Sequence, residues 1–101
     1  MKLNLSNNII ASLPIFCKLN KLKHLNVANN KISTLESKDL IFKDLKELIL
    51  EGNMIKDLKG IEAIKSNKLE SLNVSLNTLI KLPKISHFVT LKEFKADKNQ
   101  I

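Results

Sequence analysis

The sequence predicts a solenoid, in which short parallel strands stack into one sheet and short turns return along its other side. Two observations predict this fold. One phrase ending in an asparagine occurs five times in 101 residues, at intervals of 22 to 24 residues. Apolar residues precede each of these asparagines by three and five positions, which is the pattern of a strand with one buried face. Such a short strand cannot bury that face alone, so successive copies must stack.

The asparagines define the register of every copy. They are Asn8, Asn30, Asn53, Asn77 and Asn99. The strand residues expected to point inward are the pairs Leu3 and Leu5, Leu25 and Val27, Leu48 and Leu50, Leu72 and Val74, and Phe94 and Ala96. The copies divide the chain into repeats of approximately residues 1–21, 22–44, 45–68, 69–90 and 91–101, all within a single domain.

Each return segment shows a second apolar pattern, with a period of three residues. One series runs Leu79, Leu82, Ile85, Phe88 and Leu91, and the others run Ile10, Leu13, Phe16, Leu19 and Ile55, Leu58, Ile61, Ile64. In a 3₁₀ turn, residues three apart eclipse on one side. We therefore expect short 3₁₀ turns and loops, and not long helices, on the outer side.

The combined pattern is L-x-x-L-x-L-x-x-N-x-L, and over nearly its whole length the chain resembles the leucine-rich repeat family. The spacing is similar to the 22-residue class typified by the regulatory subunit of protein phosphatase 1, except in the longer repeats near Leu40–Leu45 and Ile64–Leu69. The resemblance implies an α/β-type solenoid whose curved parallel sheet lines a concave, partner-binding face. The outer turns would form the convex face.

Both ends of the array are expected to be incomplete. The first repeat starts inside its strand, and the last repeat stops just after Asn99. Natural solenoids need polar terminal caps. We therefore expect a fragment or an uncapped array of about five repeats, with end-to-end self-association through the open ends as one consequence.

The repeated asparagines are expected to be structural. A coil that turns sharply after its strand exposes backbone groups inside the stack, and a side-chain amide can both donate to and accept from them. Buried polar groups are normally occupied with hydrogen bonds. We therefore interpret all five asparagines as rungs of a hydrogen-bonded ladder and not as binding or catalytic residues.

Composition limits the function classes. The net charge is +7, but all 17 basic residues are lysine, and Trp and Tyr are absent, which disfavours phosphate forks and base stacking. Specific nucleic-acid binding is therefore not expected, although weak lysine-driven binding stays an alternative. The chain shows no membrane span, and its single cysteine, Cys17, excludes an internal disulfide. With no secretory signal in the sequence, we expect an intracellular protein, cytoplasmic or nuclear, from a eukaryote.

No residue constellation indicates chemistry. His24 lies in the second strand and His87 on the far side of a later coil, so the register keeps them apart. Glu47 and Glu51 share one side of a strand and its turn, but nothing apolar encloses them. We predict a protein that is not an enzyme and has no metal, no cofactor and no small-molecule substrate.

The register identifies the residues that face solvent on the concave side. Its charged residues are Lys2, Lys23, Lys46, Lys92, Lys95 and Lys98 together with Glu47, Glu51, Glu70, Glu93 and Asp97. Residues such as Ala28 and Ser75, at the ends of the strands, are assigned to the same side. This nearly neutral mixture suits a protein partner better than a nucleic acid, which would concentrate cations.

The partner-binding residues that we predict on this face are His24, Asn26, Ile49, Glu51, Asn73, Leu76 and Lys95. Ile49 and Leu76 are apolar where the register predicts solvent, as in an interaction hot spot ringed by polar groups. Two other interpretations stay open, because scattered exposed apolar residues are common and Asn4, Asn26 and Asn73 could form a ladder of their own. The predicted function is a noncatalytic, regulatory protein-interaction module. The alternative is a structural spacer within a longer repeat protein.

Overall fold

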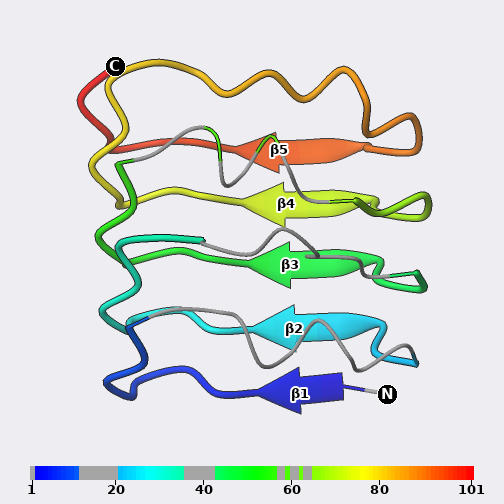
Figure 1. Ribbon diagram of the computed structural model, residues 1–101, viewed down its shortest axis with the longest axis horizontal. Coiled ribbons are helices and arrows are strands. Elements are labelled where there is room, and N and C mark those ends of the chain that lie inside the picture. The colour runs from blue at the N-terminus through cyan, green and yellow to red at the C-terminus, as the bar shows by residue number, and fades with distance from the viewer. Residues whose placement is uncertain (1, 12–20, 36–42, 57–58, 60–61, 63–64) are drawn as a thin grey trace.

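The computed structural model describes residues 2–11, 21–35, 43–56, 59, 62 and 65–101. Within these residues the chain forms a stack of coils, each contributing one strand of three residues to a single parallel sheet (Figure 1). The strands are β1 Lys2–Asn4, β2 His24–Asn26, β3 Glu47–Ile49, β4 Ser71–Asn73 and β5 Glu93–Lys95. Their order in the sheet equals their order in the sequence, which confirms the predicted solenoid.

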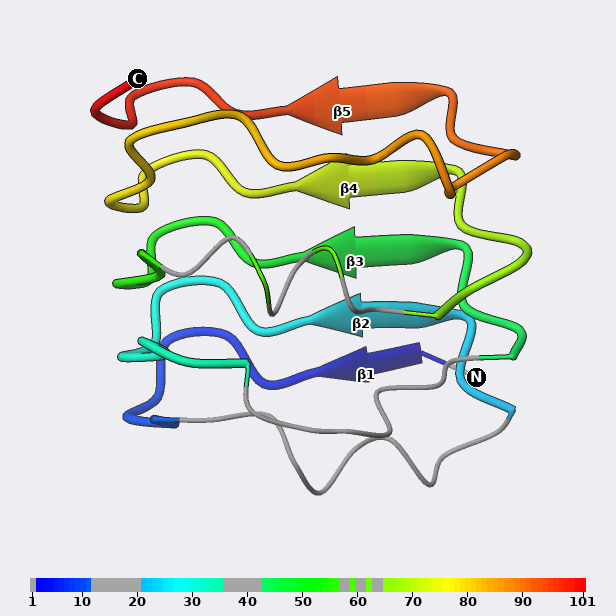
Figure 2. The same ribbon diagram turned by 45° about the horizontal axis from the view of Figure 1, so that its top comes forward.

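The strands pair in the register that the asparagines predict. Leu25 lies opposite Leu3 and Leu48, and Leu72 lies opposite Leu48 and Phe94. The central residue of each strand therefore faces the interior, and its two neighbours face the solvent side of the sheet. The described return segment between β4 and β5 (Figure 2) packs Ile85 and Phe88 against this interior, on the side that the central strand residues face.

The core is a column of aliphatic side chains between the sheet and the return segments. The fully buried leucine and isoleucine residues are Leu22, Leu25, Ile32, Leu45, Leu48, Leu50, Ile55, Leu69, Leu72 and Leu79. In every internal coil, the leucine at the strand centre and the isoleucine or leucine two positions after the asparagine are thus both part of this core. At the two ends, Leu3, Leu5, Phe94 and Ala96 are only partly buried because each has a coil on one side alone.

The three-residue apolar period produces turns in the return segment between β4 and β5, whereas Lys59 and Glu62, between β3 and β4, are α-helical. The backbone N–H of Phe88 donates to the carbonyl of Ile85, and that of Leu91 donates to the carbonyl of Phe88. These are the i to i+3 bonds of 3₁₀-type turns, and they place the same three side chains against the core. The predictions made for Leu13, Phe16, Cys17 and Leu19, and those for Leu58, Ile61 and Ile64, lie outside the described residues.

The backbone changes direction at the residue just before each ladder asparagine. Asn7, Asn29, Gly52, Leu76 and Lys98 all have positive φ, between 53° and 71°. Glycine and asparagine adopt this left-handed conformation readily, whereas it strains other side chains. The first three coils therefore use residues suited to the turn, and the last two do not.

Candidate protein-binding face

The ladder asparagines of the middle coils are buried and saturated with hydrogen bonds. In Asn53, Oδ1 accepts from the N–H of Ile32 at 3.0 Å, and Nδ2 donates to the carbonyls of Leu50 and Val27 at 2.9 and 3.1 Å. Asn30 and Asn77 make the equivalent bonds to their own coil and to the coil before it. Each asparagine therefore joins two successive coils.

The two terminal asparagines differ in their surroundings. Asn99 reaches back to the coil before it, with Oδ1 accepting from Leu79 N–H at 3.0 Å and Nδ2 donating to the carbonyl of Val74 at 3.1 Å. Asn8 is exposed, and its Nδ2 donates only within its own coil, to the carbonyls of Leu5 and Ser6. Among the described residues, the asparagines that bond to the coil before them are Asn30, Asn53, Asn77 and Asn99. Asn8 bonds within its own coil and does not connect two coils.

The concave face has two solvent-facing rows within the strands. In the row formed by the first strand residues, His24 Nδ1 lies 3.3 Å from Glu47 Oε1, and Ser71 Oγ donates to Glu93 Oε1 at 3.2 Å. Lys95 Nζ, from the second row, lies 4.0 Å from the same Glu93 oxygen. Since these groups are part-exposed, each contact is weak by itself. Together they make a polar surface with both signs of charge.

The second row contains Asn4, Asn26, Ile49, Asn73 and Lys95. Its three asparagines do not bond to one another. Each Oδ1 accepts instead from the backbone N–H two residues ahead, as from Ala28 at 2.9 Å and from Ser75 at 3.0 Å. This row is therefore a series of local caps at the strand ends, interrupted by Ile49 in the middle coil.

Two residues assigned to the solvent side are in fact buried. Ala28 is 7% exposed and Ser75 is 5% exposed. The chain bends inward after each strand, so that the next coil covers this position, and Ser75 Oγ accepts from the N–H of Asp97 at 3.1 Å. The predicted solvent assignment is wrong at these two positions.

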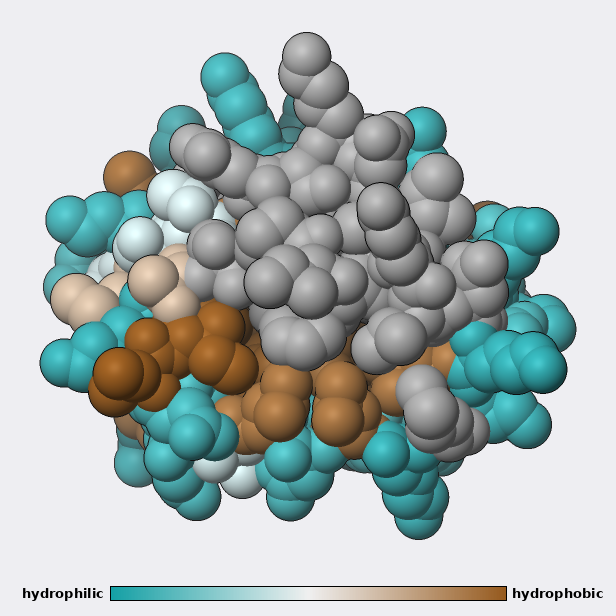
Figure 3. Space-filling view, turned by 60° about the horizontal axis from the view of Figure 1, so that its bottom comes forward, coloured by the Kyte–Doolittle hydropathy of each residue, from teal (hydrophilic) through white to brown (hydrophobic). Residues whose placement is uncertain are grey.

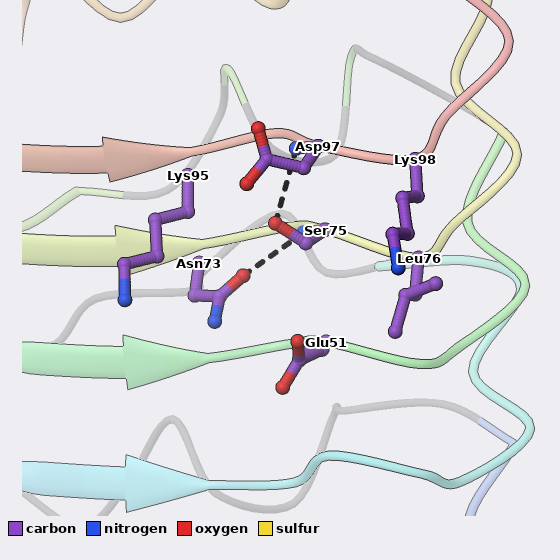
Figure 4. Close-up of a pocket in the computed structure, with 7 residues that line it drawn as sticks. All are labelled: Glu51, Asn73, Ser75, Leu76, Lys95, Asp97 and Lys98. Atoms are coloured by element: carbon purple, nitrogen blue, oxygen red, sulfur yellow. Dashed lines mark hydrogen bonds between the residues drawn. The ribbon is translucent and has the colours of Figure 1, made fainter.

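A hollow of about 370 Å³ lies on the concave face at the C-terminal part of the stack. Figure 4 shows the residues that line it, with side chains from three neighbouring coils directed to one region. They are Glu51, Asn73, Ser75, Leu76, Lys95, Asp97 and Lys98. Two carboxylates and two ammonium groups thus line the same hollow as one apolar side chain.

Leu76 is unusual in two respects. Its side chain is 45% exposed, and its φ is +54°. A leucine at this position lowers stability twice, because its backbone is strained and its apolar surface contacts water. The coils before it have asparagine or glycine here, which avoid both costs. Of the predicted site residues, Glu51, Asn73, Leu76 and Lys95 line the hollow, whereas His24, Asn26 and Ile49 lie on the face outside it.

The histidines are separated, as the register requires. His24 pairs with Glu47 on the concave face, and the ring of His87 packs on Phe88 with centroids 4.0 Å apart. Among the described residues, no group of three or more His, Cys, Asp or Glu side chains is arranged to hold a metal ion. In the same part of the chain, no helix has the length and apolar character needed to cross a membrane.

Sequence reasoning missed a second set of polar rungs at the other end of the strands. Buried Ser66 donates through Oγ to the carbonyl of Leu45 at 3.1 Å, and Thr90 Oγ1 donates to the carbonyl of Leu69 at 2.7 Å. Each bond joins the end of one repeat to the beginning of the same repeat. Ser66 stands three positions before Leu69, whereas Thr90 stands one position before Leu91. The two hydroxyl residues do not share one position of the repeat, so the repeat pattern does not predict them.

The N-terminal end of the stack presents apolar surface, visible in brown between polar side chains in Figure 3. Ile9 is 81% exposed, and Leu3, Leu5 and Ile10 are only partly buried. At the other end, Val89 and Ile101 are 82% and 60% exposed. End-to-end self-association through these surfaces stays a prediction.

Comparison with known families supports the interpretation of the repeats. Residues 2–40 match a family model described as Leucine Rich repeats, in two copies. This range contains β1 and β2, and the parallel pairing continues from β2 through β5 without a change of register. The matched repeats and the later coils therefore share one geometry.

Proposed function

Because this chain is a leucine-rich repeat protein with a parallel β-solenoid fold, and such domains generally bind proteins, we propose that it is a noncatalytic interaction module. Its protein partner contacts the concave face around Leu76 and Ile49. The partner contributes an apolar side chain to the hollow and charged groups of both signs around it. No residue in this role has to perform chemistry.

The single observation that carries the proposal is the exposed, strained Leu76. Strained residues persist where the surrounding structure supports them, and they cluster at functional sites. Energetic hot spots in protein interfaces are apolar groups ringed by polar ones. Leu76 fits this description in part, because it lines one hollow together with Glu51, Lys95 and Asp97.

The test uses replacements that the protein itself suggests. In the second coil asparagine occupies the positions equivalent to both Ile49 and Leu76, as Asn26 and Asn29. The double variant Ile49→Asn, Leu76→Asn should therefore fold, and relief of the left-handed strain should stabilise it by about 1 kcal/mol. Affinity capture from source cells with quantitative mass spectrometry should lose at least one specific partner of the wild-type protein.

The matched control removes exposed apolar residues elsewhere. Ile80 and Leu82 are 64% and 59% exposed and lie on the return segment. The variant Ile80→Asn, Leu82→Asn should retain the partner. If the folded concave-face variant captures the same proteins as the wild type, the face is unused and the spacer function replaces this proposal.

A regulatory role is a narrower form of the same proposal. The 22-residue repeat spacing is similar to that of the phosphatase regulator class, so phosphatase catalytic subunits are the first candidates to look for among captured proteins. An intracellular setting, cytoplasmic or nuclear, also belongs to the proposal. The presence of a single cysteine in 101 residues supports it, because secreted domains of this size commonly carry disulfides.

A further inference from the structure

A second charged surface lies beside the concave face, where the chain turns into each strand. These turns, at the right of Figure 1, comprise residues 21–23, 43–46, 67–70 and 90–92, and we call them the leading edge. Its lysines, all exposed, are Lys21, Lys23, Lys43, Lys46, Lys68 and Lys92. Its carboxylates are Asp44 and Glu70. The leading edge is therefore strongly basic, and it includes Lys23, Lys46 and Lys92, which the register assigned to the concave face.

The backbone holds part of the leading edge in a regular column. The carbonyl of Lys23 accepts from the N–H groups of both Lys46 and Glu47, at 2.8 and 3.1 Å. The carbonyls of Lys46 and Glu70 accept in the same way from the next coil. Successive side chains in this column are thus fixed one strand spacing apart, roughly 4.8 Å. Binding to them would not require the backbone to become ordered.

The carboxylates of the leading edge are already paired. Asp44 Oδ1 accepts from Lys68 Nζ at 3.0 Å, and Glu70 Oε1 lies 3.6 Å from Lys92 Nζ. Hydrogen bonding and charge from Lys68, with smaller contributions from Lys23 and Lys43, lower the pKa of Asp44. Asp44 therefore lies among three ammonium groups and stays ionised.

Apart from Lys21, which makes another contact, three lysines of the leading edge are left after this pairing. Within the described residues, Lys23, Lys43 and Lys46 have no carboxylate within ion-pair distance. Clustered like charges raise the energy of the free protein and attract a ligand of opposite sign. The strands themselves carry no excess of positive charge, because their two lysines, Lys2 and Lys95, are balanced by two glutamates, Glu47 and Glu93.

We propose that the leading edge binds an acidic segment of a protein, whose carboxylates pair with Lys23, Lys43 and Lys46. Charge complementarity favours an anionic ligand, and the side chains favour carboxylates over nucleic acid. The chain has no arginine for bidentate phosphate binding. The described phenylalanines, Phe88 and Phe94, pack in or against the core, so they are not available to stack on bases.

This inference goes beyond the proposed function, because it does not require the concave face to bind anything. The probe is a fluorescein-labelled decaglutamate peptide, measured by fluorescence anisotropy with the whole chain. The variant Lys23→Gln, Lys43→Gln, Lys46→Gln removes the three unpaired charges. We expect its affinity to be about ten-fold lower, given the small contribution of each exposed ion pair.

The matched control removes the same charge from the opposite edge. Lys31, Lys56 and Lys81 are exposed and lie beyond the turns that follow the strands. The variant Lys31→Gln, Lys56→Gln, Lys81→Gln should bind the peptide within about two-fold of the wild type, because separation beyond the roughly 8 Å screening length weakens its influence. Replacing the three leading-edge lysines by arginine, which keeps the charge, should preserve binding.

Three results would overturn the inference. Equal loss in both glutamine variants would mean that net charge alone attracts the peptide. Unchanged binding in the leading-edge variant, with its circular dichroism spectrum intact, would exclude the site. A single-stranded oligonucleotide of equal charge that binds more tightly than decaglutamate at physiological salt would assign the edge to nucleic acid.

Discussion

Asn53 and Asn8 occupy the same turn in different coils, and they show what a neighbouring coil adds. Asn53 is 7% exposed and bonds to the coil before it through both ends of its amide. Asn8 is exposed and bonds only within its own coil. The same residue type is thus a connection between coils in one place and a local turn cap in the other. Its effect on stability depends on stacking and not on the turn itself.

The hydrogen bonds that Asn53 shares with neighbouring asparagines show which backbone group depends on Asn53 alone. The carbonyl of Leu50 accepts from Asn53 and also from Asn77, and that of Val27 accepts from Asn30 and Asn53. These carbonyls keep one partner if Asn53 is lost. The N–H of Ile32, in contrast, has the Oδ1 of Asn53 as its partner and is buried.

The largest expected effect is that of Asn53→Ala. It strands the N–H of Ile32, weakens the bonding of Leu50 and Val27, and leaves a small cavity. A stranded buried group costs about 1 to 3 kcal/mol, so we expect a loss of about 3 kcal/mol in all. Urea unfolding followed by circular dichroism measures this loss. The amide proton of Ile32 should also exchange faster, and unchanged exchange there would contradict the assigned role.

An intermediate effect is expected from Gly52→Ala, at the residue before the same asparagine. Gly52 has a φ of +71°, which costs alanine about 1 to 2 kcal/mol. The added Cβ would also meet the side-chain oxygen of Asn29, whose amide bonds to Asn7 at 3.1 Å. We therefore expect the free energy of unfolding to fall by about 2 kcal/mol.

Gly52→Asn separates the two causes of that loss. Asparagine meets the same crowding from Asn29 but tolerates positive φ, so it should be less destabilising than alanine. The comparison again uses urea unfolding. Equal losses in the two variants would mean that crowding alone decides, and the strain assigned to Leu76 and Lys98 would then lose its support.

The sheet could be predicted because its signals are local and repeated. Alternation around Leu25, Leu48 and Leu72 identifies the inward side of each strand, and the asparagine spacing aligns the coils, so one register satisfies every repeat. The positive φ was harder to predict, since asparagine and glycine indicate it at Asn7, Asn29 and Gly52, whereas Leu76 and Lys98 conceal it.

The candidate site could be predicted less completely, for a different reason. The pairing of His24 with Glu47 and of Lys68 with Asp44 joins residues more than twenty positions apart, and it depends on rotamers that a repeat pattern does not specify. The leading edge likewise emerges only when the turns stack. In sequence its lysines lie in four separate turns, each with at most one carboxylate. Only stacking pairs Asp44 with Lys68 and brings Lys23 beside Lys46 in the next coil.

The smallest expected change in the free energy of unfolding is that of Asn8→Ala, which completes the comparison of Asn8 with Asn53. In Asn8→Ala the carbonyl of Leu5 keeps the amide of Asn30 as a donor at 2.9 Å, and water can reach the other exposed groups. No buried N–H loses its partner among the described residues, so the loss should stay within about 0.5 kcal/mol, as for an ordinary surface substitution. Urea unfolding beside Asn53→Ala measures the difference directly. A loss at Asn8 as large as that at Asn53 would mean that the asparagine acts through its own turn, and that coil-to-coil bonding contributes little.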